Sequence, residues 1–292
     1  MFWRRVRLAL EMIKFEHSVF ALPFALTGAL LAVREGGIAG AELWRRLGWI
    51  VVAMVGARSA AMGWNRLADR RIDAANPRTA ARALPAGRVT PRFVLAFVLA
   101  SCGLLVLAAW RLNPLCLALS PVALLVLLGY SYTKRFTALS HFFLGLALGG
   151  APLGAWIAVR GDVGATPFLL GGAVVLWVAG FDVLYALQDL DFDRRSGLYS
   201  IPARMGVAGA LWISGLLHVV MLGLLAALPW VYPPGLGAAY WAGLAGCLLM
   251  IGYQHAIVRP GDLSRLNAAF FTANGALSLW LFAATAVDLL RR

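Results

Sequence analysis

The 292-residue chain is 61% hydrophobic and only 13% charged, with a mean hydropathy of +0.79. Soluble domains carry about 25% charged residues, so this composition argues against a water-soluble protein. The net charge of +13 would by itself suit nucleic-acid binding. The basic residues, however, gather in short segments between long apolar stretches, so we expect no nucleic-acid partner and a lipid bilayer instead.

Nine apolar stretches follow one another along the chain, each long enough to cross the hydrocarbon core of a membrane. Because lipid offers no partner to exposed backbone groups, segments of this length are predicted to be α-helices. We therefore predict an all-α polytopic membrane protein with about nine transmembrane helices. Without a repeat or linker to divide it, the chain is predicted to be one domain. The predicted spans are roughly 17–33, 48–64, 92–110, 114–131, 141–159, 167–189, 207–229, 235–258 and 268–289.

The basic residues are divided unevenly between the two sides of these spans. On alternate sides, 18 of the 26 Lys and Arg residues fall on the side of the N-terminus and 7 on the other, and Arg58 lies within a span. Cytoplasmic loops carry the excess of Lys and Arg, so the N-terminus is predicted to be cytoplasmic and the C-terminus outside. The Arg291–Arg292 pair at the C-terminus runs against this count.

A first acidic segment follows the second predicted span. It reads NRLADRRIDAANPRTAARALPAG over residues 65–87. Asn65, Asp69 and Asp73 are spaced i, i+4, i+8, which places them along one face of a helix. Like charges at this spacing repel each other, so a compensating group is expected nearby.

A second acidic segment, FDVLYALQDLDFDRRSGLYSIPARMG, follows the sixth predicted span. Asp182, Asp189 and Asp193 are spaced i, i+7, i+11, and Tyr185 joins the same stripe. The two segments hold six of the 13 acidic residues. Because both follow even-numbered spans, both are predicted to open on the cytoplasmic side.

Two facing rows of carboxylates at an aqueous mouth are typical of a magnesium site. Mg²⁺ prefers oxygen ligands and is commonly held by one or two carboxylates together with substrate phosphates. Acids at a membrane edge are costly and usually mark a substrate or ion path, which favours function over a simple helix cap. Asp191 lies off the stripe, and for it both explanations stay open. Interleaved arginines can hold phosphate oxygens bidentately: Arg66, Arg70, Arg78, Arg82 and Arg194.

Other arginines need no function of this kind. Arg71, Arg88 and Arg195, and Arg70 as well, are explained by the excess of positive charge that cytoplasmic loops carry.

The two motifs resemble those of the UbiA superfamily of intramembrane prenyltransferases. The resemblance rests on N-x-x-x-D-x-x-x-D followed by PRTAARALPAG, and on D-x-x-Y-x-x-x-D-x-D-x-D followed by SIPARMG. GARSAAMGWN before the first motif and YSYTKRFT at 130–137 add to it. It extends over most of the chain and includes the layout of the spans.

The resemblance implies an all-helical fold around a central cavity, open toward the membrane for an isoprenoid tail. It also implies Mg²⁺-dependent transfer of a polyprenyl group from polyprenyl diphosphate. Asn65, Asp69, Asp73, Asp189 and Asp193 match the metal and diphosphate positions, and the four aspartates would be catalytic.

Substrate-binding positions are implied in the same way. Asp182 and Tyr185 match the start of the second motif, and Arg58 matches the arginine that precedes the first. Lys134 and Arg135 match a basic pair near the diphosphate or an acceptor carboxylate.

Aromatic side chains that face the cavity can stabilise an allylic cation, and Tyr185 is the candidate, with Tyr130 and Trp64 behind it.

The acceptor is open at this stage. The 4-hydroxybenzoate branch of the superfamily commonly has Asn-Asp where this chain has Asn65-Arg66, and the segment IKFEHSVFALPFA also departs from that branch. The resemblance implies an aromatic acid such as 4-hydroxybenzoate, in ubiquinone biosynthesis, or a dihydroxynaphthoate, in menaquinone biosynthesis. It places the protein in the inner membrane of a bacterium. A transporter of an anionic substrate is the alternative of another class. Tail length and oligomeric state stay open.

The histidines carry weaker expectations. His17 and Glu16 form a polar pair at the mouth of the first span, as an acceptor contact or an interfacial pair. His141 is expected at the membrane interface, and His218 in a hydrogen bond between helices. His255 has no assigned role.

Overall fold

The computed structural model describes residues 8, 18–36 and 38–291, and over these residues the chain is helical, as predicted. The only strand-like feature among them is an isolated bridge between Arg259 and Asp262. The elements are α2 (Ser18–Gly36), α3 (Gly40–Ala68), α4 (Arg70–Ala75), α5 (Pro91–Leu112), α6 (Pro114–Thr133), α7 (Ser140–Arg160), α8 (Ala165–Tyr185), η2 (Ala186–Asp189), α9 (Leu190–Arg195), α10 (Ile201–Val231), α11 (Ala238–Ile257), η3 (Ala268–Ala273) and α12 (Asn274–Leu290).

Seven helical segments in the described part are long and apolar enough to cross a membrane, so the chain is a multi-pass membrane protein. The helices α2 and α11 coincide with the first and eighth predicted spans but are not among the seven, so the count of nine stays a prediction. Several helices are longer than their predicted spans, because extending a helix costs little once it is nucleated. The seven segments are Gly40–Ala68, Pro91–Leu112, Pro114–Thr133, Ser140–Arg160, Ala165–Arg195, Ile201–Val231 and Ala268–Leu290.

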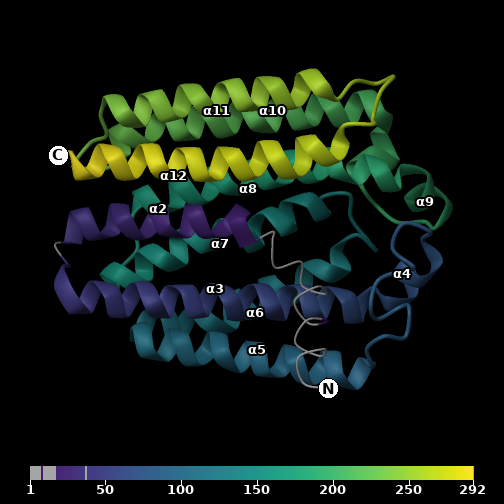
Figure 1. Cartoon of the computed structure of the whole chain (residues 1–292), viewed down its shortest axis with the longest axis horizontal. Helices are drawn as coiled ribbons and strands as arrows, with labels where there is room; N and C mark the ends of the chain where they lie inside the picture. Colours follow the sequence, from purple (N-terminus) through teal and green to yellow (C-terminus); the bar gives the residue numbers. More distant parts are fainter. Residues whose placement is uncertain (1–7, 9–17, 37, 292) are drawn as a thin grey trace.

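The long helices lie side by side in a bundle (Figure 1). The helix α8 packs against α7 and α10, α2 packs against α7 and α12, and α3 packs against α5 and α6. Large buried side chains such as Phe24, Trp156 and Trp177 fill the core where these helices meet. Small residues allow close approach: a Cβ at Gly28 of α2 would lie 2.4 Å from the carbonyl oxygen of Pro152 on α7.

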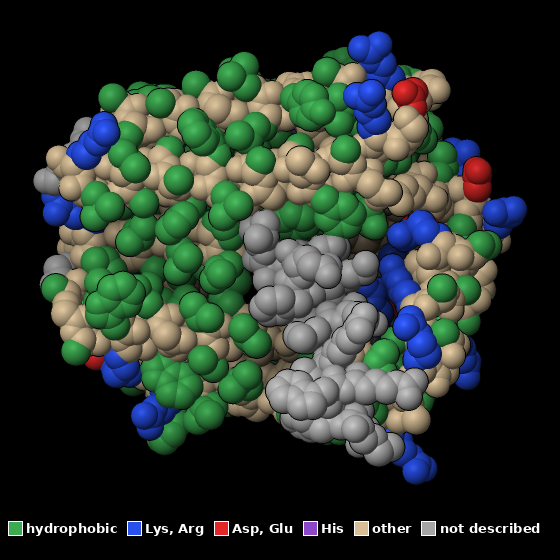
Figure 2. Space-filling model, viewed as in Figure 1, with side chains coloured by type: hydrophobic (Ala, Val, Ile, Leu, Met, Phe, Trp, Pro, Cys, Tyr) green, Lys and Arg blue, Asp and Glu red, His purple; other side chains and the backbone are tan. Residues whose placement is uncertain are grey.

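Both acidic segments lie at one end of this bundle. The short helices α4 and α9 are at the right in Figure 1, and the C-terminus is at the opposite end. On the face that Figure 2 shows, Lys and Arg side chains gather at the same end, and hydrophobic side chains cover the flanks of the long helices. The polar chemistry of the chain is therefore concentrated where the motifs are.

Candidate functional site

The first motif spans the junction of α3 and α4. Asp69 lies between these helices with φ −90° and ψ 5°. The helical hydrogen bonds nevertheless continue, since the Asp69 amide donates to the Asn65 carbonyl at 2.9 Å and the Asp73 amide to the Asp69 carbonyl at 2.8 Å. The register is thus kept, and all three side chains line one cavity.

The second motif spans the end of a long helix, a 3-10 turn and a short helix. α8 ends at Tyr185, a single 3-10 turn covers Ala186–Asp189, and α9 follows. Such turns are common at helix ends. Asp182, Tyr185, Asp189 and Asp193 all line the same cavity as the first motif. The off-stripe Asp191 is exposed and is not among the lining residues.

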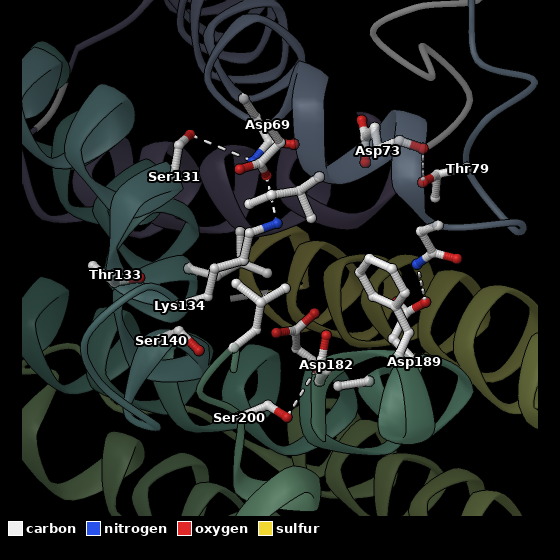
Figure 3. Close-up of a pocket in the computed structure, with 18 of the residues that line it drawn as sticks. Asp69, Asp73, Thr79, Ser131, Thr133, Lys134, Ser140, Asp182, Asp189 and Ser200 are labelled. Atoms are coloured by element: carbon white, nitrogen blue, oxygen red, sulfur yellow. Dashed lines mark hydrogen bonds and ion pairs between the residues drawn. The ribbon is translucent and has the colours of Figure 1, made fainter. Parts of the chain in front are cut away.

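This cavity, of about 240 Å³, lies between the two motifs (Figure 3). In the close-up, Asp69 and Asp73 are on one side, and Asp182 and Asp189 are on the other. Of the ten predicted site residues all but Arg58 and Arg135 line it, and their catalytic and binding roles stay predictions. The eight are Asn65, Asp69, Asp73, Lys134, Asp182, Tyr185, Asp189 and Asp193.

Asp69 is held by three donors. Lys134 Nζ lies 2.6 Å and Arg135 Nη2 lies 3.0 Å from its carboxylate oxygens, and Asn65 Nδ2 donates at 3.1 Å. The carboxylate is buried, and an uncompensated charge there would be strongly unfavourable. The basic pair after α6 therefore compensates the first aspartate, and Arg135 does so from outside the cavity lining.

Asp73 is equally buried and is compensated from the segment that follows it. Arg82 Nη1 donates to Oδ1 at 2.8 Å, and Arg66 Nη1 lies 3.9 Å from Oδ2. The Thr79 hydroxyl donates to the Asp73 backbone carbonyl at 2.9 Å, which fixes the turn after α4. Oδ2 itself accepts no hydrogen bond from the described residues.

Asp189 joins the two motifs. Arg78 Nε donates to Oδ1 at 2.9 Å, Arg78 Nη2 pairs with Oδ2, and Asn76 Nδ2 donates to Oδ1 at 2.8 Å. Burial, the largest single influence, disfavours the charged guanidinium, but the hydrogen bond and charge of Asp189 together with Tyr185 outweigh it, so the pKa of Arg78 is raised. Residues just after the first motif thus bind the second motif.

Neither Asp193 nor Asp182 forms an ion pair with a Lys or Arg among the described residues. The Ser200 hydroxyl donates to Asp193 at 3.0 Å and accepts from the Ala203 amide at 3.2 Å, as the N-cap of α10. Asp182 Oδ2 lies 2.7 Å from Nδ1 of His141.

His141, which was predicted to lie at the membrane interface, is a buried residue of the cavity wall. Its side chain is 4% exposed and lines the cavity, because α7 begins at Ser140 beside the motifs and its second residue, His141, points inward. A signal was present in the sequence. His141, Gly145 and Gly149 are spaced i, i+4, i+8, and both glycines pack closely against the backbone of α8.

The three aromatic candidates differ in whether they line the cavity. The Tyr185 ring stacks on Phe270, with ring centroids 4.0 Å apart, and the Arg78 guanidinium lies 5.6 Å from the Tyr185 centroid. Tyr130 also lines the cavity, whereas Trp64 does not.

Of the proposed phosphate-binding arginines, Arg66, Arg78 and Arg82 line the cavity. Arg70 and Arg194 instead donate to the backbone carbonyls of Leu67 and Ala203.

His17 and Glu16 lie outside the described residues.

The donor set fits a divalent metal that is shared with a phosphate group. Among the described residues no three His, Cys, Asp or Glu side chains are grouped to hold a metal by themselves. The cavity does offer hard carboxylate and amide oxygens from two facing rows, and Asp73 Oδ2 has no hydrogen-bond donor among the described residues. Mg²⁺ commonly takes one or two carboxylates and completes its shell with phosphate and water, so these residues fit such a joint site.

Known proteins match this chain over most of its length. The model of the UbiA prenyltransferase family matches residues 21–281. A 4-hydroxybenzoate octaprenyltransferase of Aeromonas salmonicida is 32% identical over 243 residues, which cover 82% of this chain and 81% of that protein. One of Xanthomonas oryzae pv. oryzae is 34% identical over 218 residues, or 74% and 72% of the two chains.

Solved structures share the fold. The apo structure of a UbiA homolog from Aeropyrum pernix K1 is 36% identical and aligns with a TM-score of 0.83, over 94% of this chain and 98% of that chain. A UbiA homolog from Archaeoglobus fulgidus bound to DMAPP and Mg²⁺ is 17% identical, with a TM-score of 0.74 over 97% and 99% of the chains. This chain belongs to the UbiA prenyltransferase family.

Proposed function

We propose that this prenyltransferase moves a polyprenyl group from polyprenyl diphosphate to the ring of 4-hydroxybenzoate or a similar aromatic acid, with Mg²⁺ as cofactor. The observation that carries the proposal is the cavity in which the two aspartate rows face each other with Arg and Lys between them. The names of the relatives support the acceptor, and the homolog bound to DMAPP and Mg²⁺ supports the donor and the metal. The transporter alternative has no support, since the family is one of enzymes.

The diphosphate is bound by the cations that now compensate the aspartates. The side chains of Arg78, Arg82 and Lys134 are 32%, 30% and 32% exposed, whereas those of the carboxylates they contact are 19%, 6% and 3% exposed. The cations therefore lie nearer the opening, where an entering diphosphate meets them first. Arginine can hold phosphate oxygens in a bidentate pair, and lysine as a point charge.

As these cations turn toward the phosphates, the carboxylates become available to a metal. When bound, Mg²⁺ would neutralise the negative charge that develops on the leaving diphosphate. The residues that would hold it are Asn65, Asp69, Asp73, Asp189 and Asp193.

Tyr185 faces the group that ionises. Breaking the C1–O bond of the prenyl diphosphate leaves an allylic cation, which an aromatic face stabilises by a cation–π contact. The ring of Phe270 stacks on Tyr185 and holds it in place. The rings of Phe181, Phe270 and Phe271, which pack together beside Tyr185, would help to keep water from quenching the cation. The acceptor ring then attacks at carbon.

We place the site on the cytoplasmic face of the inner membrane of a bacterium, in a chain that is one domain. The excess of Lys and Arg on the side of the two motifs supports this orientation.

The test uses the purified protein in detergent with a labelled long-chain polyprenyl diphosphate. The substrates 4-hydroxybenzoate and a dihydroxynaphthoate are offered side by side, with Mg²⁺ or with EDTA. We expect Mg²⁺-dependent prenylation of 4-hydroxybenzoate, and its loss in Asp69→Ala and Asp189→Ala variants that still fold. Prenylation of the naphthoate alone would replace the proposed acceptor, and failure to bind the diphosphate would overturn the reaction itself.

A further inference from the structure

The five carboxylates that line the cavity are not equivalent. Asp69, Asp73 and Asp189 are each paired with Lys or Arg. Asp182 lies seven residues before Asp189 on the helix that leads to the site, roughly 10 Å deeper along it. In Figure 3 it lies across the cavity from Asp69 and Asp73. Asp182 thus stands apart from the charges that suit a metal and a diphosphate.

The partner of Asp182 is a histidine whose tautomer is fixed by a second contact. The backbone amide of Ile201, in the first turn of α10, points at His141 Nε2 at 3.3 Å. An amide can only donate, so Nε2 accepts and carries no proton. The imidazole proton is therefore on Nδ1, which donates to Asp182 Oδ2 at 2.7 Å. The pair is a neutral histidine that holds a carboxylate.

The two residues differ in their access to the cavity. The His141 side chain is 4% exposed and the Asp182 side chain 24% exposed, so the histidine is enclosed while the carboxylate reaches the cavity. One residue on α7 thereby fixes a carboxylate on α8 and is itself fixed by α10. A buried orienting donor behind an accessible acceptor is the arrangement that a general base needs.

The reaction supplies a proton that must be removed. If the proposed prenyl transfer is right, the C1–O bond breaks and its electron pair leaves with the diphosphate. A π pair of the acceptor ring forms the new C–C bond. The ring carbon then loses its proton, and the C–H pair restores aromaticity. The other four carboxylates of the cavity are poorly suited to take this proton, since the proposed function assigns Asp69, Asp73, Asp189 and Asp193 to the metal.

We propose that Asp182 accepts the ring proton and that His141 is the positioning residue that holds Asp182 for this step. The inference rests on the proposed function and deepens it. It gives Asp182, at the start of the second motif, a role in the reaction of the aromatic acceptor that is separate from diphosphate binding.

The first test measures turnover of acceptor that is deuterated on the ring against unlabelled acceptor. In the wild type we expect equal rates, because loss of the ring proton is fast. Asp182→Asn keeps the size of the side chain but removes the base, so kcat should fall by about 10²–10⁴-fold. In this variant the deuterated acceptor should react more slowly, while the KM and binding of polyprenyl diphosphate stay unchanged.

The second test addresses His141. His141→Leu should lower kcat by about 10²-fold through misplacement of the carboxylate, and it should also reveal the isotope effect. His141→Asn places an amide donor near the position of Nδ1 and should restore most of the activity. His255→Leu, which removes a histidine outside the cavity lining, serves as the matched control with no isotope effect.

The outcomes separate the two claims. If the wild type prenylates neither acid, the proposed function falls and this inference with it. If the wild type turns over and Asp182→Asn keeps a normal kcat, or loses activity with no isotope effect and weaker diphosphate binding, only the inference is overturned. In the second case His141 and Asp182 would be a structural link between α7, α8 and α10.

Discussion

Arg78 connects the two motifs, and replacing it with methionine tests whether this connection binds the diphosphate. Its guanidinium makes two contacts with the Asp189 carboxylate. Hydrogen bonds to charged groups contribute about 1.5–3 kcal/mol each. Asn76 still donates to Asp189 at 2.8 Å, and the Arg78 side chain is 32% exposed. The loss of folding stability should therefore lie near the lower end, about 1–2 kcal/mol.

The effect on catalysis should be larger than the effect on stability. Loss of one charged contact to the diphosphate, about 1.5–3 kcal/mol, corresponds to a fall in kcat/KM of roughly 10- to 100-fold. The assay is Mg²⁺-dependent prenylation at limiting polyprenyl diphosphate, with thermal unfolding measured in parallel. Arg78→Lys keeps the charge but not the paired donors, so we expect an intermediate value.

The matched control is Arg195→Met. Arg195 is exposed, lies in the second motif and donates only to the Asp191 carbonyl, at 3.2 Å, in the described structure. This variant changes the net charge by the same amount but touches no cavity residue. Equal losses of kcat/KM in Arg78→Met and Arg195→Met would show that the net positive charge of the protein attracts the diphosphate, and not the arginine that contacts Asp189. The reasoning would then be refuted.

Three further predictions test the metal, the packing and the second motif. Calorimetry should show that Mg²⁺ alone binds weakly and that it binds tightly with polyprenyl diphosphate present, while EDTA abolishes turnover; tight binding of Mg²⁺ alone would contradict the joint site. Gly28→Ala should lower the free energy of unfolding by about 1–3 kcal/mol, because its Cβ would lie 2.4 Å from the Pro152 carbonyl oxygen. The control is Gly150→Ala, which should leave the melting temperature unchanged because a Cβ at Gly150 meets nothing within 4 Å. Ser200→Ala should lower the free energy of unfolding by about 0.5–2 kcal/mol, because the N-cap of α10 is lost, and should lower activity, because Asp193 loses its hydrogen bond. Ser200→Thr should retain the contacts with Asp193 and with the Ala203 amide.

The aspartate rows could be predicted from the sequence because each depends on local helical spacing. Asn65, Asp69 and Asp73 keep the predicted register across the break between α3 and α4. The partners of the aspartates could not be predicted in the same way. Lys134 is 65 residues from Asp69, and Asn76 is 113 residues from Asp189. Such pairs depend on how helices pack, which a hydropathy pattern does not specify.

The histidines and aromatics show the same division. His218 was predicted to bond between helices, and its Nδ1 lies 2.9 Å from Nε2 of His255. That prediction needed only a polar residue inside a span. The cavity position of His141 could not be predicted from its own segment, because it depends on contacts with α8 and α10. The stacking of Phe270 on Tyr185 depends on the π-helical turn η3, which has no clear sequence pattern.

The internal cations explain how the chain holds several carboxylates at a membrane edge before any substrate arrives. A carboxylate that is buried or half-buried without a partner is unfavourable, so Asp69, Asp73 and the half-buried Asp189 need compensation in the folded protein itself. A metal alone would have to displace these cations, and a diphosphate alone would leave the acids uncompensated. When both arrive together, the cations can turn to the phosphates and the acids to the metal. Each charge then keeps an opposite partner, which is why we expect the site to favour a metal–diphosphate pair over either component alone.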